Sequence, residues 1–319
     1  MEKRQIGHSS LRIAPWVLGG NVFGWTADEK TSHAILDEFV AAEFNCIDTA
    51  NVYSRWKAGN KGGESETIIG NWLKKTGKRS DVIIATKVGM EMGADKKGLK
   101  RNYIIQEVEA SLKRLQTDYI DLYFSHQDDF DTPLLETLDT YATLIKEGKV
   151  RAIGASNFSP DRLTESLILS MKYDYPRYEC LQPEYNLYER SGFEKELQEI
   201  CIDKQIGVVP YYSLASGFLT GKYRTEKDFE KSARSGGVKR FMNDKGNRIL
   251  ATLDEVAVLH NATPAQIALA WLLVQPGITA PIASVSKPEQ VQELAKAATL
   301  ILDITTIAKL NAAGKPVHA

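Results

Sequence analysis

Short apolar runs rich in β-branched residues alternate along the chain with longer amphipathic segments. Each run is almost continuously apolar, which is typical of parallel strands whose two faces are both covered. The alternation therefore predicts an α/β protein with eight parallel strands. The predicted strands are Val17–Gly20, Asn45–Asp48, Val82–Lys87, Tyr119–His126, Val150–Ser156, Glu179–Gln182, Gly207–Tyr211 and Ile278–Ile282.

The amphipathic segments between these runs have the residue spacing of helices. In two of them the apolar residues recur every three or four positions, which places them on one face of a helix. Ser159-Pro160 and Thr263-Pro264 each combine a capping hydroxyl with proline at the first helical position, so we expect helices to begin there. The two apolar stripes are Ile105, Val108, Leu112 and Leu115, and Leu134, Leu138, Tyr141 and Ile145.

Eight strands that alternate with helices fit either a closed barrel or an open doubly wound sheet. A doubly wound sheet that binds a dinucleotide normally shows GxGxxG after its first strand, and no GxG occurs in this chain. The pattern therefore favours a (β/α)8 TIM barrel with extra loop or helix insertions. No strong linker divides residues 1–319, so we expect one domain, with Met1–Ala14 as a small hairpin before the first barrel strand.

The longest stretch that we predict to be irregular, Ser213 to Arg248, lies between the predicted seventh and eighth strands. It is rich in glycine and in lysine and arginine, while Glu226, Asp228 and Glu230 dilute the positive charge. One interpretation is a solvated loop. Long loops in compact domains are often functional, however, and in a barrel this one lies on the catalytic rim, so an anionic ligand is the second interpretation.

Length and composition limit the class of protein. A chain of 319 residues has the size of one α/β barrel, and 43% apolar with 25% charged residues is ordinary for a globular protein. The formal net charge of −1 gives no reason to expect a nucleic-acid partner or an acidic membrane partner.

Cysteine usage and the N-terminus indicate a cytoplasmic protein. The three cysteines share no CxxC spacing, which favours a reducing compartment without a disulfide framework. The N-terminal segment MEKRQIGHSS is charged and lacks the apolar stretch of a signal peptide. The longest clean apolar run, Ile267 to Val274, is far shorter than the roughly 20 residues that span a bilayer.

Ionisable side chains end three successive predicted strands. Asp48 ends FNCIDTA, Lys87 ends VIIATK and His126 ends IDLYFSH, while Tyr53 follows Asp48 by five residues. Taken singly, each has a plain structural interpretation, such as a turn residue, a rim charge or a packing residue. Because the C-terminal ends of barrel strands converge on one mouth, we expect these four side chains to meet there.

Together the four residues suit the reduction of a carbonyl group. A carbonyl that accepts hydride becomes an alkoxide, which needs a proton donor and electrostatic support for its oxygen. The ordinary phenol pKa is near 10, and a neighbouring ammonium is expected to lower it. We therefore expect Tyr53 to act as general acid, Lys87 to tune it, Asp48 to anchor Lys87, and His126 to orient the substrate.

Other kinds of catalytic site fit less well. GASNF lacks the final glycine of a GxSxG hydrolase motif, so Ser156 is not a predicted nucleophile. Five scattered histidines without HExxH or CxxC predict no metal site. An aldolase that uses Lys87 as a Schiff base remains a weaker alternative, because it would not explain Tyr211 or the GASNF segment.

A set of ordered motifs resembles the aldo-keto reductase family, in its bacterial NADP-dependent form, which is related in fold to potassium-channel β subunits. The motifs extend from near Ala14 to about Ala298. In the resemblance, the family's catalytic tetrad falls on Asp48, Tyr53, Lys87 and His126. The motifs are IDTANVY, IIATKVG, DLYFSHQDD, GKVRAIGASNF, LQPEYNLYER, PYYSLASGFLTGKY and PIASVSKPEQVQEL.

The resemblance implies a nicotinamide cofactor, NADPH/NADP+, with NADH as a weaker alternative. Ser156, Asn157 and Gln182 match positions that hydrogen-bond the carboxamide, and Tyr211 matches the aromatic residue that stacks on the nicotinamide ring. Trp25 is expected to form part of the substrate pocket wall with Tyr53 and His126. The remaining residues implied near the nicotinamide or pyrophosphate are Asn21, Asp48, Ser213, Leu214, Gly217 and Lys222.

The adenosine end departs from the family pattern. Leu294 stands where the family usually has asparagine, and Ser286 stands where arginine is common. Ser286 and Lys287 are expected to begin a helix whose free amide groups favour phosphate. The residues implied at this end are Arg234, Ser284, Ser286, Lys287, Gln290 and Glu293.

The sequence thus favours an NADPH-dependent oxidoreductase that reduces a small-molecule aldehyde or ketone to an alcohol. The alternative is a nucleotide-binding regulatory or redox-sensing subunit of the same fold, which the tetrad alone does not exclude. The natural substrate and the oligomeric state stay open.

Overall fold

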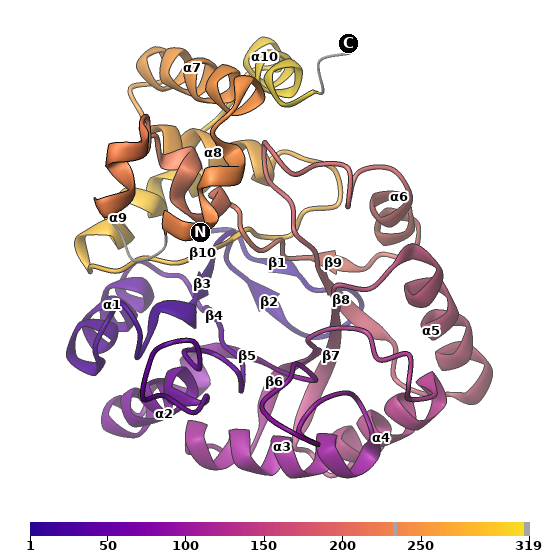
Figure 1. Cartoon of the computed structure of the whole chain (residues 1–319). Coiled ribbons are helices and arrows are strands. Elements are labelled where there is room, and N and C mark those ends of the chain that lie inside the picture. Colours follow the sequence, from indigo (N-terminus) through magenta and orange to yellow (C-terminus); the bar gives the residue numbers. More distant parts are fainter. Residues whose placement is uncertain (232–234, 316–319) are drawn as a thin grey trace.

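The computed structural model describes residues 1–231 and 235–315. Its central element is a parallel sheet of eight strands in the order β10-β3-β4-β5-β6-β7-β8-β9, which curls into a barrel (Figure 1). The predicted fold class is confirmed. The barrel strands are β3 (Val17–Gly19), β4 (Cys46–Asp48), β5 (Ile83–Val88), β6 (Ile120–Ser125), β7 (Val150–Ser156), β8 (Tyr178–Gln182), β9 (Gly207–Val208) and β10 (Ile282–Ala283).

The ring closes between the last two strands through irregular hydrogen bonding. Val208 and Ile278 form an isolated parallel bridge, and the Ile282 amide donates to the Pro210 carbonyl at 2.9 Å. The predicted strands at Gly207–Tyr211 and Ile278–Ile282 are therefore too long or displaced. Pro210 and Pro281 lack an amide hydrogen, which interrupts the ladder at both positions.

Helices surround the barrel in chain order (Figure 1). Ser159 and Thr263 cap the starts of α5 and α8, as predicted, and Thr263 forms a full capping box with Gln266. Three of the four predicted stripe residues are buried in each of α3 and α4, while Ile105 and Ile145 are only partly buried and their neighbours Ile104 and Leu144 are buried. The surrounding helices are α1 (Glu29–Ala41), α2 (Glu64–Thr76), α3 (Arg101–Leu115), α4 (Leu134–Lys146), α5 (Pro160–Tyr173), α6 (Glu196–Asp203), α8 (Pro264–Leu273) and α9 (Glu289–Ala295).

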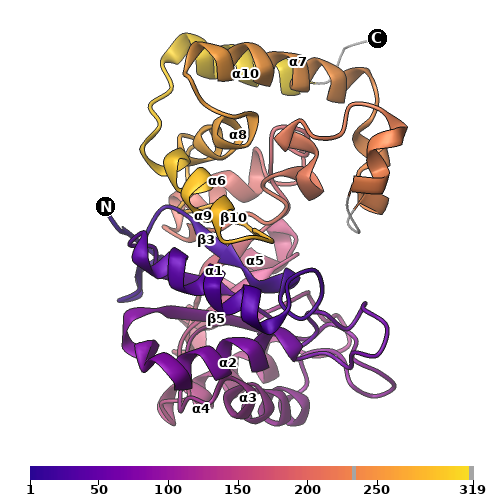
Figure 2. The ribbon, with the colours of Figure 1, turned by 90° about the vertical axis from the view of Figure 1, so that its left-hand side faces the viewer.

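Two further helices lie outside this ring. α7 (Asp244–Leu259) and α10 (Ile304–Gly314) pack together over α8, on one side of the barrel (Figures 1 and 2). The predicted irregular stretch between the last two strands contains several 3₁₀ turns, and α7 already begins at Asp244. The Asn243 side chain caps that start by accepting a hydrogen bond from the Gly246 amide.

The predicted N-terminal hairpin is present and closes one mouth of the barrel. β1 (Arg4–Gln5) pairs antiparallel with β2 (Arg12–Ile13). Ile6, Leu11 and Ile13 are buried against inward-facing strand residues such as Cys46 and Leu122. In Figure 2 the N-terminal end lies opposite the long loops at the other mouth, so the open mouth is the one where the strands end.

Within the described ranges 1–231 and 235–315, no single helix is long and apolar enough to cross a membrane, although the bent pair α7 and α8 passes that test when counted together.

Candidate active site

A cavity of about 540 Å³ lies at the mouth where the strands end. Asp48, Ser156 and Gln182, each the last residue of its strand, line it. Residues of two loop segments, 213–222 and 284–294, complete the wall. The sequence-predicted residues that line the cavity are Asn21, Asp48, Tyr53, His126, Ser156, Asn157, Gln182, Tyr211, Ser213, Leu214, Gly217, Lys222, Ser284, Ser286, Gln290 and Glu293.

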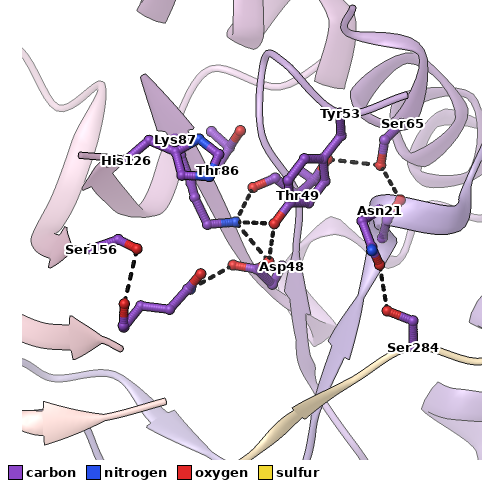
Figure 3. A network of polar contacts seen from close by, with 12 residues as sticks. Asn21, Asp48, Thr49, Tyr53, Ser65, Thr86, Lys87, His126, Ser156 and Ser284 are labelled. Carbon is purple, nitrogen blue, oxygen red and sulfur yellow. Dashed lines mark hydrogen bonds and ion pairs between the residues drawn. The ribbon is translucent and has the colours of Figure 1, made fainter. Parts of the chain in front are cut away.

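Three of the four predicted catalytic side chains form a hydrogen-bonded triangle (Figure 3). Lys87 Nζ donates to Asp48 Oδ2 at 2.7 Å and to Tyr53 Oη at 2.7 Å. The Tyr53 hydroxyl donates to Asp48 Oδ2 at 3.1 Å. Lys87 Nζ also donates to the Thr49 carbonyl at 2.8 Å, so its three protons all have acceptors.

The ends of β4 and β5 and the turn after β4 place this triangle. In the β4–β5 register, Asp48 lies opposite Ala85, and the Thr49 amide continues the ladder to the Ala85 carbonyl at 2.8 Å. The chain then turns tightly, because the Tyr53 amide donates to the Ala50 carbonyl at 3.2 Å. This turn brings the Tyr53 ring back over Lys87 Nζ, 4.4 Å from the ring centroid.

The charged pair beneath Tyr53 is fully enclosed. Lys87 is 0% exposed and Asp48 is 2% exposed. Burial lowers the pKa of Lys87, while the neighbouring Asp48 carboxylate raises it. Gln182 Nε2 donates to Asp48 Oδ1 at 3.0 Å, so both carboxylate oxygens are satisfied, as a buried carboxylate requires.

The expected net lowering of the Tyr53 pKa is wrong for this arrangement, because burial and Asp48 outweigh the hydrogen bond from Lys87. Burial raises the pKa of the Tyr53 phenol well above its ordinary value, and the Asp48 carboxylate raises it further. Desolvation is the largest cause of this rise, although Tyr53 as a whole is only partly buried and lines the cavity. The phenol therefore keeps its proton at neutral pH, which is the state that a proton donor needs.

His126 reaches the same cavity from the end of β6. Burial lowers its pKa well below the ordinary value, and the Lys87 ammonium lowers it further, so the imidazole is neutral. Its ring lies 6.0 Å from the Tyr53 ring, edge to face. His126 lines the cavity, while its Nδ1 is buried and has no hydrogen-bond partner among the described residues.

The predicted carboxamide-binding residues lie together at the ends of β7 and β8. Asn157 Nδ2 donates to the His126 carbonyl at 3.0 Å, and Asn157 Oδ1 accepts from the Tyr211 hydroxyl at 2.7 Å. The Ser156 hydroxyl donates to the Gln182 carbonyl at 2.9 Å. Several of these polar groups already have protein partners, so a bound amide would have to compete for them.

The predicted pyrophosphate loop has an unusual backbone. Tyr212, Ala215 and Ser216 have positive φ values of 51°, 48° and 57°, and Gly217 follows with φ 91°. Successive left-handed residues are costly for L-amino acids and cluster at ligand sites. Lys222, on the same wall, places an ammonium group beside this bare backbone.

The predicted phosphate-binding helix begins later than expected. α9 starts at Glu289, and Gln290 Oε1 accepts from the Ser286 amide at 2.8 Å and from the Lys287 amide at 3.2 Å. The two amide groups expected to be free are therefore occupied. Lys287 is exposed and does not line the cavity, and Arg234 lies outside the described residues.

Several cavity residues were not predicted from the sequence. Trp56 and Met90 line the cavity, and Trp56 packs 5.9 Å from the Tyr53 ring. Trp25, expected in the substrate wall, lies behind Trp56 at 5.7 Å, edge to face, and is not a lining residue. Only the position of Trp56, three residues after Tyr53, hinted at its place.

The chain is similar to known proteins along almost its whole length. A sequence model of the Aldo/keto reductase family matches residues 15–315. The chain is 34% identical to the uncharacterized oxidoreductase YrpG of Bacillus subtilis, over 98% of this chain and 95% of that protein. It is 32% identical to protein tas of Escherichia coli, over 98% and 97%. A probable voltage-gated potassium channel subunit beta of Arabidopsis thaliana is 31% identical, over 96% and 94%.

Proposed function

This chain belongs to the aldo/keto reductase family, and on that premise we propose that it reduces an aldehyde or a ketone to an alcohol with NADPH. The observation that carries the proposal is the enclosed triangle: Lys87 Nζ lies 2.7 Å from both Tyr53 Oη and Asp48 Oδ2, with Lys87 wholly buried. Tyr53 itself lines the cavity, so its hydroxyl is available to a substrate.

The cavity residues fit a nicotinamide dinucleotide. Ser156, Asn157 and Gln182 offer the hydroxyl and amide groups that match the donor and acceptor of a carboxamide. The bare backbone at Gly217 and the ammonium of Lys222 suit a pyrophosphate. When bound, the cofactor supplies a hydride to the carbonyl carbon.

The protein supplies the proton and holds the oxygen. The neutral His126 imidazole donates a hydrogen bond to the carbonyl oxygen and orients it, and Tyr53 gives its hydroxyl proton to the same oxygen. The Tyr53 proton that now points to Asp48 must first turn towards the substrate. Lys87, already bonded to Tyr53 Oη, stabilises the phenolate that results, until a proton returns from the solvent.

The aromatic entrance favours apolar substituents on the substrate. Trp56 and Tyr212 line the cavity and remain 49% and 43% exposed, so both offer apolar surface to an incoming molecule. A carbonyl compound with a flat or branched apolar group would cover that surface.

The alternative is a nucleotide-binding regulatory or redox-sensing subunit. Relatives named as potassium-channel β subunits match this chain nearly as closely as the oxidoreductases do. In this alternative the same residues would hold the cofactor, but turnover would be slow or would require a partner. The cytoplasmic location expected from the sequence remains a prediction.

The test is NADPH oxidation by the purified chain with a panel of aldehydes, ketones and sugars, and with NADH in parallel. We expect turnover without any added partner, and faster turnover with NADPH than with NADH. Tight binding of NADPH without turnover on the whole panel would instead favour the regulatory subunit.

A further inference from the structure

The first turn of α2 turns two consecutive polar side chains inward. Ser65 and Glu66 are both 0% exposed, in a helix that packs its apolar face on the barrel. A buried carboxylate is costly unless it is paired and hydrogen-bonded. Glu66 is both paired and hydrogen-bonded, and its partners connect it to the active site.

Each of the two side chains binds a threonine of the barrel. Ser65 Oγ accepts from Thr49 Oγ1 at 2.8 Å and donates to the Gly20 carbonyl at 2.8 Å. Glu66 Oε1 accepts from Thr86 Oγ1 at 2.6 Å, and Glu66 Oε2 accepts from Arg114 Nε at 2.6 Å. One helical turn therefore holds two neighbouring strands at once.

These threonines are the chain neighbours of the catalytic pair. Thr49 follows Asp48 and Thr86 precedes Lys87, and successive side chains of a strand point to opposite faces. Lys87 points to the cavity floor, while Thr86 points outward to α2. The Thr49 carbonyl is itself an acceptor for Lys87 Nζ, at 2.8 Å, and Figure 3 shows Thr49, Ser65 and Thr86 around the triangle.

We propose that Ser65 and Glu66 are positioning residues, which hold the ends of β4 and β5 so that Lys87 Nζ stays on Asp48 and Tyr53. Neither side chain contacts the substrate in this proposal, because each acts through the threonine that it binds. The consequence for catalysis rests on the proposed function. The effect of these residues on the Lys87 titration can be measured whether or not the proposed function is correct.

Glu66 also adds charge behind Lys87. The groups that influence the Lys87 ammonium are Asp48 and Cys46 from β4 and Glu66 from α2, with Tyr53 and His126 beside it at the cavity. Burial lowers the pKa of Lys87, and Asp48 and Glu66 raise it.

The groups around Glu66 itself come from two other elements. Arg114 and Glu107 reach it from α3, and Tyr123 faces it from β6. Arg114 offsets part of the Glu66 charge. Glu107 accepts a hydrogen bond from Asn51 at 2.9 Å, lies 3.8 Å from Arg114, and is not among the leading causes of the Lys87 pKa shift. It is therefore the matched control for Glu66.

The experiment follows the titration of Lys87 by NMR, in protein labelled with ¹³C at the lysine ε-carbon and without cofactor. The Lys87 signal is assigned by its loss in Lys87→Met. In Glu66→Gln we expect the pKa of Lys87 to fall by about half to one unit, because a nearby negative charge is removed while the side-chain shape is kept. In Glu107→Gln the pKa should stay at the parent value.

A second readout uses the reaction. In Glu66→Gln the alkaline fall of kcat/KM should move to lower pH by a similar amount, whereas a residue that only aids folding would reduce the amount of active protein without moving the profile. An unchanged Lys87 titration in Glu66→Gln overturns the proposal. An equal shift in Glu107→Gln does so too, because the effect would then be general to the cluster.

Thr86 offers a further variant if Glu66→Gln does not fold. In Thr86→Val we expect the Lys87 titration to move in the same direction and kcat to fall about tenfold at unchanged KM, and Thr86→Ser should restore both. Parent behaviour in Thr86→Val contradicts the proposal. A Lys87 shift in Thr86→Val, which changes no charge, in a chain that reduces no carbonyl would leave the positioning role standing and reject the proposed function alone.

Discussion

The cavity has two parts that are built differently. In the strand-end part, Asp48, Lys87 and Gln182 are at most 2% exposed, and short hydrogen bonds fix their positions. In the loop part, made of segments 213–222 and 284–294, Lys222 and Glu293 are exposed. The proposed chemistry and the proposed carboxamide contacts of Ser156 and Gln182 thus lie at strand ends, and the proposed pyrophosphate contacts lie on loops.

The two parts differ in how much they must rearrange to bind a ligand. In the strand-end part, packing of the folded chain already fixes the positions of the charged side chains. In the loop part, polar groups bind one another, as Gln290 binds the amides of Ser286 and Lys287. A phosphate there must replace existing hydrogen bonds, so binding at that part is linked to local rearrangement.

The largest expected effect lies in the strand-end part. Tyr53→Phe removes the only hydroxyl in the triangle and should reduce carbonyl reduction by at least about 10²-fold, as loss of a general acid does. NADPH affinity, followed by quenching of protein fluorescence, should stay near the parent value, because the loop part is unchanged. Tyr173→Phe, on the exposed face of α5, is the control and should behave as the parent.

If Tyr53→Phe kept most of its activity on several aldehydes, the strand-end part would not be the source of the proton. The proton would then come from another group or from water. A parallel loss of NADPH affinity would show that Tyr53 also belongs to the binding surface.

An intermediate effect is expected for the two basic residues that the sequence implies near the cofactor's phosphates, of which Arg234 lies outside the described residues. Lys287→Ala and Arg234→Ala should each lower kcat/KM for NADPH about tenfold more than for NADH, because only NADPH carries the additional phosphate and a charged contact is lost. Lys287 is exposed outside the cavity lining, so this outcome requires the segment to move on binding. Equal losses with both cofactors would show that neither side chain recognises that phosphate.

The last effect is on stability and concerns His126. Its pKa is lowered in the folded state, so the unfolded chain takes up a proton below the ordinary histidine pKa while the folded chain does not. Stability from this group is complete above that pKa and is lost as the pH falls. Urea unfolding should show that between about pH 7.5 and about pH 5.5 the parent loses about 1.4 kcal/mol more than His126→Gln.

Equal acid sensitivity of the parent and His126→Gln would show that the folded imidazole accepts a proton easily. His126 would then belong with the adaptable groups of the loop part and not with the fixed strand-end part.

The strand-end part was largely predictable from sequence. Apolar runs end on Asp48, Lys87 and His126, and barrel topology alone requires those ends to converge. The helix starts at Pro160 and Pro264 were predictable for a similar reason, because the capping chemistry is local. The direction of the Tyr53 pKa was not, since it depends on burial depth, which residue types do not reveal.

The loop part was less predictable because its structure depends on contacts between distant residues. Gln290 reaches back to two amides, and nothing in SKPEQVQEL distinguishes this from a helix that begins two residues earlier. Asn243 starts α7 inside a polar, glycine-containing stretch that predicts a loop. Trp25 and Trp56 both lie in turns, and only the turn that follows Asp48 places its tryptophan in the wall.

The hairpin of β1 and β2 offers a place to attach the protein to a support at the mouth opposite the cavity. It seals the barrel at the mouth opposite the cavity, where Arg4 is anchored through the carbonyls of Leu273, Ile278 and Thr279. Lys3, exposed beside it, is a natural attachment point for a solid support or a dye. A molecule immobilised there would stand with its loops facing the solution, so tethering would leave access to the cavity unobstructed.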